Sequence, residues 1–260
     1  MLRSIIRKDT TEFFRTFKFW GFIITLLCTG ASAILSAKVF PPLVDMLYAM
    51  APEIITEPEV FKEMMTHLFP SDIRGSFEIF AADVVLFYGI VTIILTQGLI
   101  IKERKSGKWI MPLACGYKKR SLMLSKCIVY GVGTGVLAFV FSILYYLVCK
   151  VFFTDNLGWA GAVGQSFVLG IIMLGSVVLT ILLSVIYNNS VLAGTTMILL
   201  IVITPDLFNL FSFGKYLPTY LMTYTYLLPD EPMDLIIPVL GLGLVMAVMY
   251  IFAAIKIEKQ

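Results

Sequence analysis

The segment IKERKSGKWIMPLACGYKKRSLMLSK, from Ile101 to Lys126, separates two long apolar runs and sets the orientation of the chain around it. It holds 8 of the 20 Lys and Arg residues of the protein against a single acid, Glu103. Lys and Arg accumulate in the cytoplasmic loops of membrane proteins. A basic segment between two apolar runs of membrane length is therefore predicted to lie on the cytoplasmic side of the bilayer. We therefore expect a cytoplasmic loop at 102–121, with the flanking chain crossing the membrane.

The composition excludes an ordinary soluble domain. Of the 260 residues, 59% are hydrophobic and only 14% are charged, and the mean hydropathy is +0.91. A transmembrane helix needs about 20 apolar residues. Continuous apolar blocks of that length favour helices over the alternating ten-residue segments of a β-barrel. The predicted fold class is an all-α membrane protein with one transmembrane domain over residues 1–260.

Six membrane spans are predicted, and an even number places both chain ends on one side. The charge distribution identifies that side: 15 of the 20 Lys and Arg residues fall on the side of the basic loop, and 13 of the 17 acids fall on the other. Both termini are therefore expected in the cytoplasm, and we expect a bacterial cell membrane. The predicted spans are Phe19–Phe40, Ile79–Ile101, Leu122–Lys150, Ala160–Tyr187, Val191–Ile203 and Leu235–Ile255.

The amino end, residues 1–18, predicts an amphipathic helix on the membrane surface, with Leu, Ile and Phe at helical spacing and basic residues opposite. A simple charged flank before the first span is the alternative. Asp9 falls on the apolar face, where it needs a polar contact with another helix or subunit. Ala31-Ser32-Ala33 resembles a signal-peptide cleavage site, but the long charged lead and the continuing apolar run favour an uncleaved span.

Two segments are predicted to lie at the outer side. Residues 41–78 are acidic and interrupted by prolines, which favours a solvated extracytoplasmic loop of turns and short helices. A cation site is the alternative, but the segment lacks the Asp/Asn ladder with a central Gly. Residues 205–233 are aromatic and broken by prolines, which predicts re-entrant or interfacial helices at the outer leaflet.

Motifs of catalysis are missing from the sequence. His67 is the only histidine, and no nucleophile elbow, paired-His zinc motif or GxxxxGK[ST] phosphate loop is present. The chain is therefore expected to be neither an enzyme nor a cofactor-binding protein. Gly131, Gly133 and Gly135 lie in an apolar helix and predict close helix packing. Lys38 and Asp83 lie near outer helix ends, where snorkelling is expected and a mutual ion pair is the alternative.

The order of these parts resembles the type-2 permease subunits of ABC exporters. The resemblance rests on Glu103-Arg104-Lys105-Ser106-Gly107, then Pro112, Lys118-Lys119-Arg120 and Lys126, which are similar to the family's signature after its second span. A second match is LFSFGKYLPTYLMTY, before the last span. The resemblance implies a short coupling helix that docks into a separate ATPase subunit, which would bind ATP and Mg²⁺. This sequence departs from larger members because it has no fused nucleotide-binding domain.

By this resemblance, the ATPase-coupling residues and the outer-gate residues can be assigned. The implied partners are ABC ATPase subunits, a second permease that is identical or related, and membrane lipids; no nucleic acid is expected. The expected substrate is an amphiphile: an antimicrobial peptide, a drug or a lipid. An ATP-independent secondary transporter or channel, or a membrane scaffold, stays the alternative. The coupling residues are Glu103, Arg104, Gly107, Lys108, Trp109, Ile110 and Met111, and the gate residues are Phe208, Phe211, Tyr216, Pro218 and Tyr220.

Overall fold

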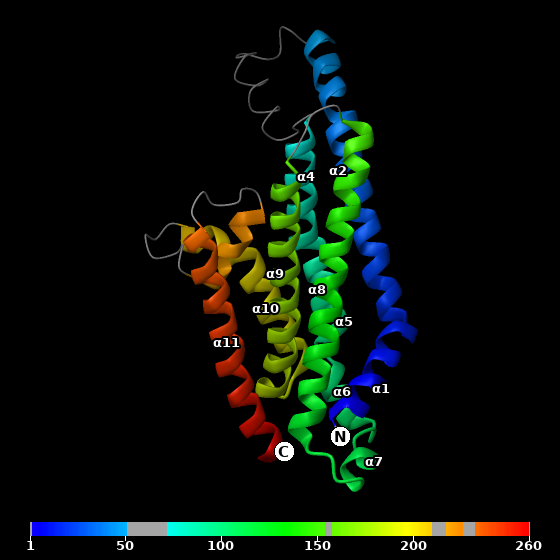
Figure 1. Ribbon diagram of the computed structural model, residues 1–260, viewed down its shortest axis with the longest axis vertical. Coiled ribbons are helices and arrows are strands. Elements are labelled where there is room, and N and C mark those ends of the chain that lie inside the picture. Colours follow the sequence, from blue (N-terminus) through cyan, green and yellow to red (C-terminus); the bar gives the residue numbers. More distant parts are fainter. Residues whose placement is uncertain (1, 51–71, 154–157, 210–216, 226–231, 260) are drawn as a thin grey trace.

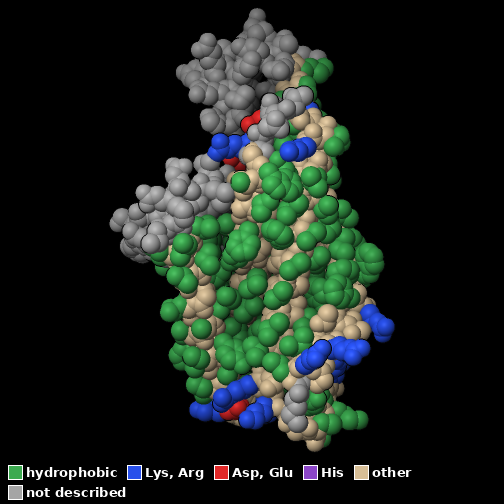
Figure 2. Space-filling view, viewed as in Figure 1, with side chains coloured by type: hydrophobic (Ala, Val, Ile, Leu, Met, Phe, Trp, Pro, Cys, Tyr) green, Lys and Arg blue, Asp and Glu red, His purple; other side chains and the backbone are tan. Residues whose placement is uncertain are grey.

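The computed structural model describes residues 2–50, 72–153, 158–209, 217–225 and 232–259, and every regular element in those ranges is helical. Five segments are long and apolar enough to cross a membrane: Phe17–Leu43, Ile73–Lys105, Lys119–Phe152, Trp159–Tyr187 and Leu235–Lys259. They form an elongated bundle with the N and C ends of the chain at the same end (Figure 1). Apolar side chains cover the middle of the visible face, and Lys and Arg gather toward that end (Figure 2). The predicted all-helical membrane class is confirmed at this level.

The amino-terminal helix is present, but it is not only a surface helix. Helix α1 covers Leu2–Arg15, and its residues Ile5, Asp9 and Phe13 are buried. These positions are four apart and share one helix face, which packs against helix α8 (Lys119–Phe152). The buried face of α1 therefore meets a transmembrane helix, whereas Leu2 and Phe14 on the rest of its surface are exposed.

Helices extend into both ends of residues 41–78, the segment predicted as the first outer loop. Helix α2 runs from Phe17 to Met50 and includes Pro41 and Pro42, and helix α4 already begins at Ile73. An interior proline removes one helical hydrogen bond and its ring clashes with the carbonyl one turn before it, which destabilises or kinks a helix without always ending it. Residues 51–71, including His67, lie outside the described residues.

The second span is a chain of helical segments rather than one regular helix. Helix α4 (Ile73–Asp83) passes into a π-helix, η1 (Val84–Tyr88), followed by α5 (Gly89–Thr96) and, after a short break, α6 (Leu99–Lys105). The side chain of Asp72 caps α4 by accepting from the Gly75 N–H at 2.9 Å. The Tyr88 hydroxyl of the π-helix donates to the Thr134 carbonyl at 3.2 Å, so this turn is held against α8.

Helix α9 (Trp159–Tyr187) is the most buried of the candidate spans and contacts α8, α10 (Ser190–Asn209) and α11 (Pro232–Lys259). Its close approach to α8 depends on glycine. A Cβ on Gly135 would lie 2.7 Å from the Gly170 carbonyl oxygen, and one on Gly131 would lie 2.6 Å from a methyl of Val178. Gly133 faces the ring of Phe13 on α1 instead. The packing role predicted for these glycines is confirmed.

The chain turns at Asn188, whose φ of 52° is left-handed, and enters helix α10 (Ser190–Asn209). The expected interruption at Pro205 is wrong, because α10 continues to Asn209. A 3₁₀-helix, η3 (Pro218–Thr225), then contacts α9, α10 and α11. The last helix, α11 (Pro232–Lys259), carries the chain back to the end of the bundle where it started (Figure 1).

Lys38 and Asp83 do not form the alternative ion pair. Asp83 instead accepts a hydrogen bond from the Ser32 hydroxyl at 3.0 Å. The ammonium of Lys38 lies 4.5 Å from the centroid of the Phe153 ring. Lys38 therefore makes a cation–π contact near the helix end, and Asp83 is tied to α2 by a hydroxyl.

Candidate functional site: a buried ion cluster above a short exposed helix

The basic segment forms two short helices rather than an extended loop. Helix α6 ends at Lys105, a tight turn follows, and helix α7 covers Ile110–Ala114 before α8 begins at Lys119. Gly107 and Gly116 on either side of α7 have φ values of 73° and 84°. This left-handed conformation is disfavoured for residues with a Cβ, so the glycines let the chain reverse direction on both sides of α7.

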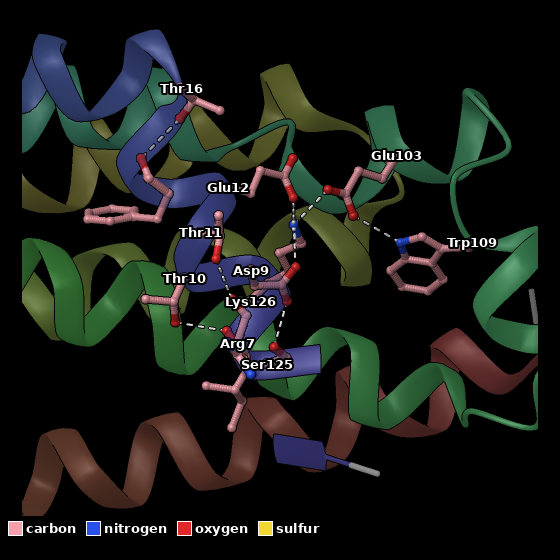
Figure 3. Close-up of polar contacts among 12 residues, drawn as sticks. Arg7, Asp9, Thr10, Thr11, Glu12, Thr16, Glu103, Trp109, Ser125 and Lys126 are labelled. Atoms are coloured by element: carbon pink, nitrogen blue, oxygen red, sulfur yellow. Dashed lines mark hydrogen bonds and ion pairs between the residues drawn. The ribbon is translucent and has the colours of Figure 1, made fainter. Parts of the chain in front are cut away.

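Lys126 is the centre of the site. Its side chain is only 4% exposed, and its ammonium nitrogen lies 2.7 Å from a carboxylate oxygen of Glu103. The same nitrogen lies 3.0 Å from oxygens of Asp9 and of Glu12. Figure 3 shows the carboxylates of Asp9 and Glu12 from α1 and of Glu103 from α6 converging on this ammonium, which belongs to α8. We call these four residues the Lys126 cluster; it joins three elements distant in sequence.

Asp9 lies on the otherwise apolar face of α1 because it pairs with polar groups of α8. Its side chain is 2% exposed, and its second carboxylate oxygen accepts a hydrogen bond from the Ser125 hydroxyl on α8. Burying a carboxylate is costly unless it is paired and hydrogen-bonded. Both conditions are met by adjacent residues of α8, Ser125 and Lys126, so Asp9 fixes how α1 lies on α8.

Neighbouring positive charges lower the pKa of Glu12, the most exposed member of the Lys126 cluster. Partial burial raises the pKa of Glu12, but the Lys126 ammonium and the hydrogen bond it donates lower it, and Lys108 and Lys8 add to this. The net pKa of Glu12 is below its usual value of 4.5. Glu12 is therefore ionised at neutral pH, and its interaction with Lys126 has its full strength there.

Trp109 connects the cluster to α7. The indole N–H of Trp109 donates to the Glu103 carboxylate at 3.1 Å, and Trp109 is 6% exposed. The Lys108 N–H donates to the Glu103 carbonyl at 3.1 Å, which closes the turn. Because Glu103 binds both Trp109 and Lys126, the start of α7 is tied through one carboxylate to α8 and, beyond it, to α1.

Helix α7 itself presents apolar side chains outward. Ile110 is 70% exposed and Met111 is 78% exposed, whereas Trp109 beside them is buried in the core of the chain. Helix α7 lies at the end of the bundle that carries both termini (Figure 1), the end toward which Lys and Arg gather (Figure 2). The result is a small apolar tip on a rigidly held helix.

The structure thus divides the predicted coupling residues into two groups. Glu103 and Trp109 lie inside, where they hold the site together, and Ile110 and Met111 lie outside. Gly107 makes the turn, Lys108 is exposed and Arg104 is partly exposed. Sequence reasoning named Lys126 as part of the motif without a role, and it missed Glu12 and Ser125. The unexplained acid at position 9 was the available signal for the cluster.

The predicted outer-gate residues are only partly within the described chain. Phe211 and Tyr216 lie outside it, and Phe208 falls within α10. Pro218 and Tyr220 belong to η3, where Pro218 lines an apolar cavity and Tyr220 packs against the main core. These two residues are therefore not near the Lys126 cluster, which lies at the opposite end of the transmembrane helices (Figure 1).

Within the described ranges, no group of three or more His, Cys, Asp and Glu side chains is arranged to hold a metal ion. The three carboxylates of the Lys126 cluster are already bound to an ammonium group. The geometry suits a structural link between helices more than a ligand site. No protein-family model matches the chain, and no curated protein matches its sequence.

Proposed function

We propose that this protein is the membrane-spanning permease subunit of an ATP-driven exporter, and that α7 is the helix that receives an ATPase subunit. The proposal rests on a difference in side-chain exposure between neighbouring residues of one short segment. Ile110 and Met111 are 70% and 78% exposed, while the neighbouring Trp109 is buried and bound to Glu103. A helix that offers an apolar tip to a groove is a common mode of protein recognition.

The proposal includes six membrane passes, with both chain ends in the cytoplasm. Five segments qualify by length and hydropathy, and α10 supplies a shorter apolar helix over Ser190–Ile203. With its 20 residues, α10 is about 30 Å long, the thickness of a bilayer core. The position of both chain ends at one end of the bundle supports this count, because five passes would separate them (Figure 1).

The Lys126 cluster supplies a route by which movement at α7 reaches the spans. A push on α7 acts on Trp109, which is bound to Glu103, and Glu103 is bound to Lys126 on α8. Lys126 in turn holds α1 through Asp9 and Glu12. We infer that α1, α6 and α8 move with α7 as one unit when the ATPase subunits close.

The remaining partners follow from the same proposal. ATP and Mg²⁺ would be bound by the ATPase subunits, since this sequence has no phosphate-binding loop of its own. A second permease, identical or related, would complete the transport path. The substrate class we propose is amphiphilic, including antimicrobial peptides, drugs and lipids, because the bundle is apolar along its length.

Acidic substitutions on α7 test the docking surface. We expect Ile110→Asp and Met111→Asp to leave the folded protein in the membrane but to abolish co-purification of the ATPase subunit in mild detergent. Val191→Asp is the matched control, since Val191 is 64% exposed at the α9–α10 turn on the same side of the bundle. Equal recovery of an ATPase with all three variants, or its absence from the wild type, would contradict the proposal.

A further inference from the structure

A second site lies far from α7, in an apolar cavity of about 230 Å³ enclosed by α9, α10, η3 and α11. Its walls include Ile172, Met197 and Leu242, which are at most 7% exposed. The cavity is larger than the apolar cavity of about 150 Å³ that can hold a benzene molecule. The space therefore suits an apolar group of roughly ten non-hydrogen atoms, by comparison with that cavity.

One wall of the cavity carries a polar atom without a partner. The hydroxyl oxygen of Thr219, in η3, is buried and makes no hydrogen bond with any residue that the structure describes. Among the described lining residues, the other hydroxyl is that of Ser176, which donates to the Ile172 carbonyl at 2.8 Å. An unpaired hydroxyl in apolar surroundings is costly, so Thr219 indicates a missing polar partner.

The depth of the cavity limits what that partner can be. Leu242 lies about two helical turns inside the outer end of the apolar part of α11, and Met197 lies about two turns from the inner end of α10. The site is therefore within the apolar thickness of the bundle. A charged group there is expensive, and an ordered water needs two to four polar partners, which the described residues of this lining do not offer.

The cavity opens to the side of the bundle. Leu200 on α10 and Val245 on α11 both line it, and they are 39% and 37% exposed. In a bilayer, this side faces lipid tails rather than water. A ligand would enter laterally between α10 and α11, from the hydrocarbon phase.

We propose that this cavity binds a neutral amphiphile from the bilayer: an alkyl chain with one hydroxyl, ester or amide group that pairs with the Thr219 hydroxyl. The apolar walls hold the chain, and the polar group pairs with the Thr219 hydroxyl, which the described residues leave unpaired. The inference does not rest on the proposed ATPase partner, since the cavity and Thr219 belong to this chain alone.

Photolabelling of the purified protein in lipid nanodiscs tests the site. The probes are a diazirine-bearing medium-chain alcohol and the matching diazirine-bearing alkane, with labelled peptides identified by mass spectrometry. We expect the alcohol to label α9, η3, α10 or α11. Labelling confined to other segments, or none above background, would overturn the proposal.

Three variants separate the polar contact from the apolar space. Thr219→Val should raise the half-saturating concentration of the alcohol about three- to tenfold, the effect of one neutral hydrogen bond, and leave labelling by the alkane unchanged. Thr195→Val on α10 is the control and should change neither, because Thr195 is exposed outside the lining and its hydroxyl already donates to the Val191 carbonyl at 3.1 Å. Val245→Trp should reduce labelling by both probes. Equal affinity of the alcohol for wild type and Thr219→Val would refute the role of Thr219.

Discussion

At the scale of single residues, the protein depends on a lysine buried among acids. Lys126 is 4% exposed on α8 and is bound to carboxylates from α1 and α6. A buried pair is weak evidence of stability in itself, but removal of one partner leaves an uncompensated charge. Here the removal of Lys126 would leave three such charges close together, which makes it the most sensitive position of the cluster.

We expect Lys126→Met to lower the free energy of unfolding by about 3–5 kcal/mol, the usual effect of breaking a buried ion pair. The measurement is thermal unfolding of the purified protein in one detergent. Lys105→Met is the control, because Lys105 is an exposed lysine of the same basic segment. A change in melting temperature no larger than that of Lys105→Met would show that the cluster does not stabilise the fold.

Acidification should remove the contribution of Glu12 to the free energy of unfolding. Its pKa is lower in the folded protein than its usual value of 4.5, so ionised Glu12 stabilises the fold above that value and the effect is lost as pH falls through the folded pKa. We expect Glu12→Gln to be less stable than wild type at pH 7 and the gap to close below pH 4.5. A gap that stays constant between those conditions would contradict this assignment.

The Lys126 cluster also shows how much of the site could be predicted from the sequence. An acid on the apolar face of an amphipathic helix predicted a polar partner for Asp9, and the structure supplies Lys126 and Ser125. The partner itself could not be predicted, because it lies more than 100 positions away in the chain and the pairing depends on how α1 packs on α8. Hydrophobic periodicity carries no information on such tertiary pairs.

At the scale of elements, the contact between α8 and α9 is set by glycines at their crossing. A Cβ on Gly135 would meet the backbone carbonyl of Gly170 at 2.7 Å, and backbone atoms cannot move aside as a flexible side chain can. We expect Gly135→Ala to destabilise the protein by about 1–3 kcal/mol, as in other overpacked cores. Gly243→Ala on α11, where a Cβ meets nothing within 4 Å, is the control. Equal melting temperatures of the two variants would contradict this packing account.

Helix identity was easier to predict from sequence than helix ends. Five of the six predicted spans match segments that are long and apolar enough to cross a membrane, because length and hydropathy can be read from the sequence. The ends were missed at Pro41, Pro42 and Pro205, where helices continue through residues usually taken as breakers. The π-helix at Val84–Tyr88 was also missed, since its extra residue per turn leaves no distinct composition signal.

At the scale of the whole molecule, the structure has two separate candidate sites. One is the Lys126 cluster, which links α7 to α1 and α8 at the end where both termini lie (Figure 1). The other is the apolar cavity with Thr219 between α9, α10, η3 and α11. An ATP-driven transporter needs a surface that couples it to the ATPase and a site that binds its substrate. Our proposals assign coupling to α7 with the Lys126 cluster and binding of an amphiphile to the cavity.

The most direct test of the central claim places a photoreactive amino acid at position 110, on the exposed tip of α7, in native membranes. We predict an ultraviolet-dependent cross-link to a soluble protein whose sequence contains a phosphate-binding loop, and no such product with the same group at position 191. Cross-links from position 110 to lipid or to this chain alone would contradict the claim that α7 receives an ATPase subunit.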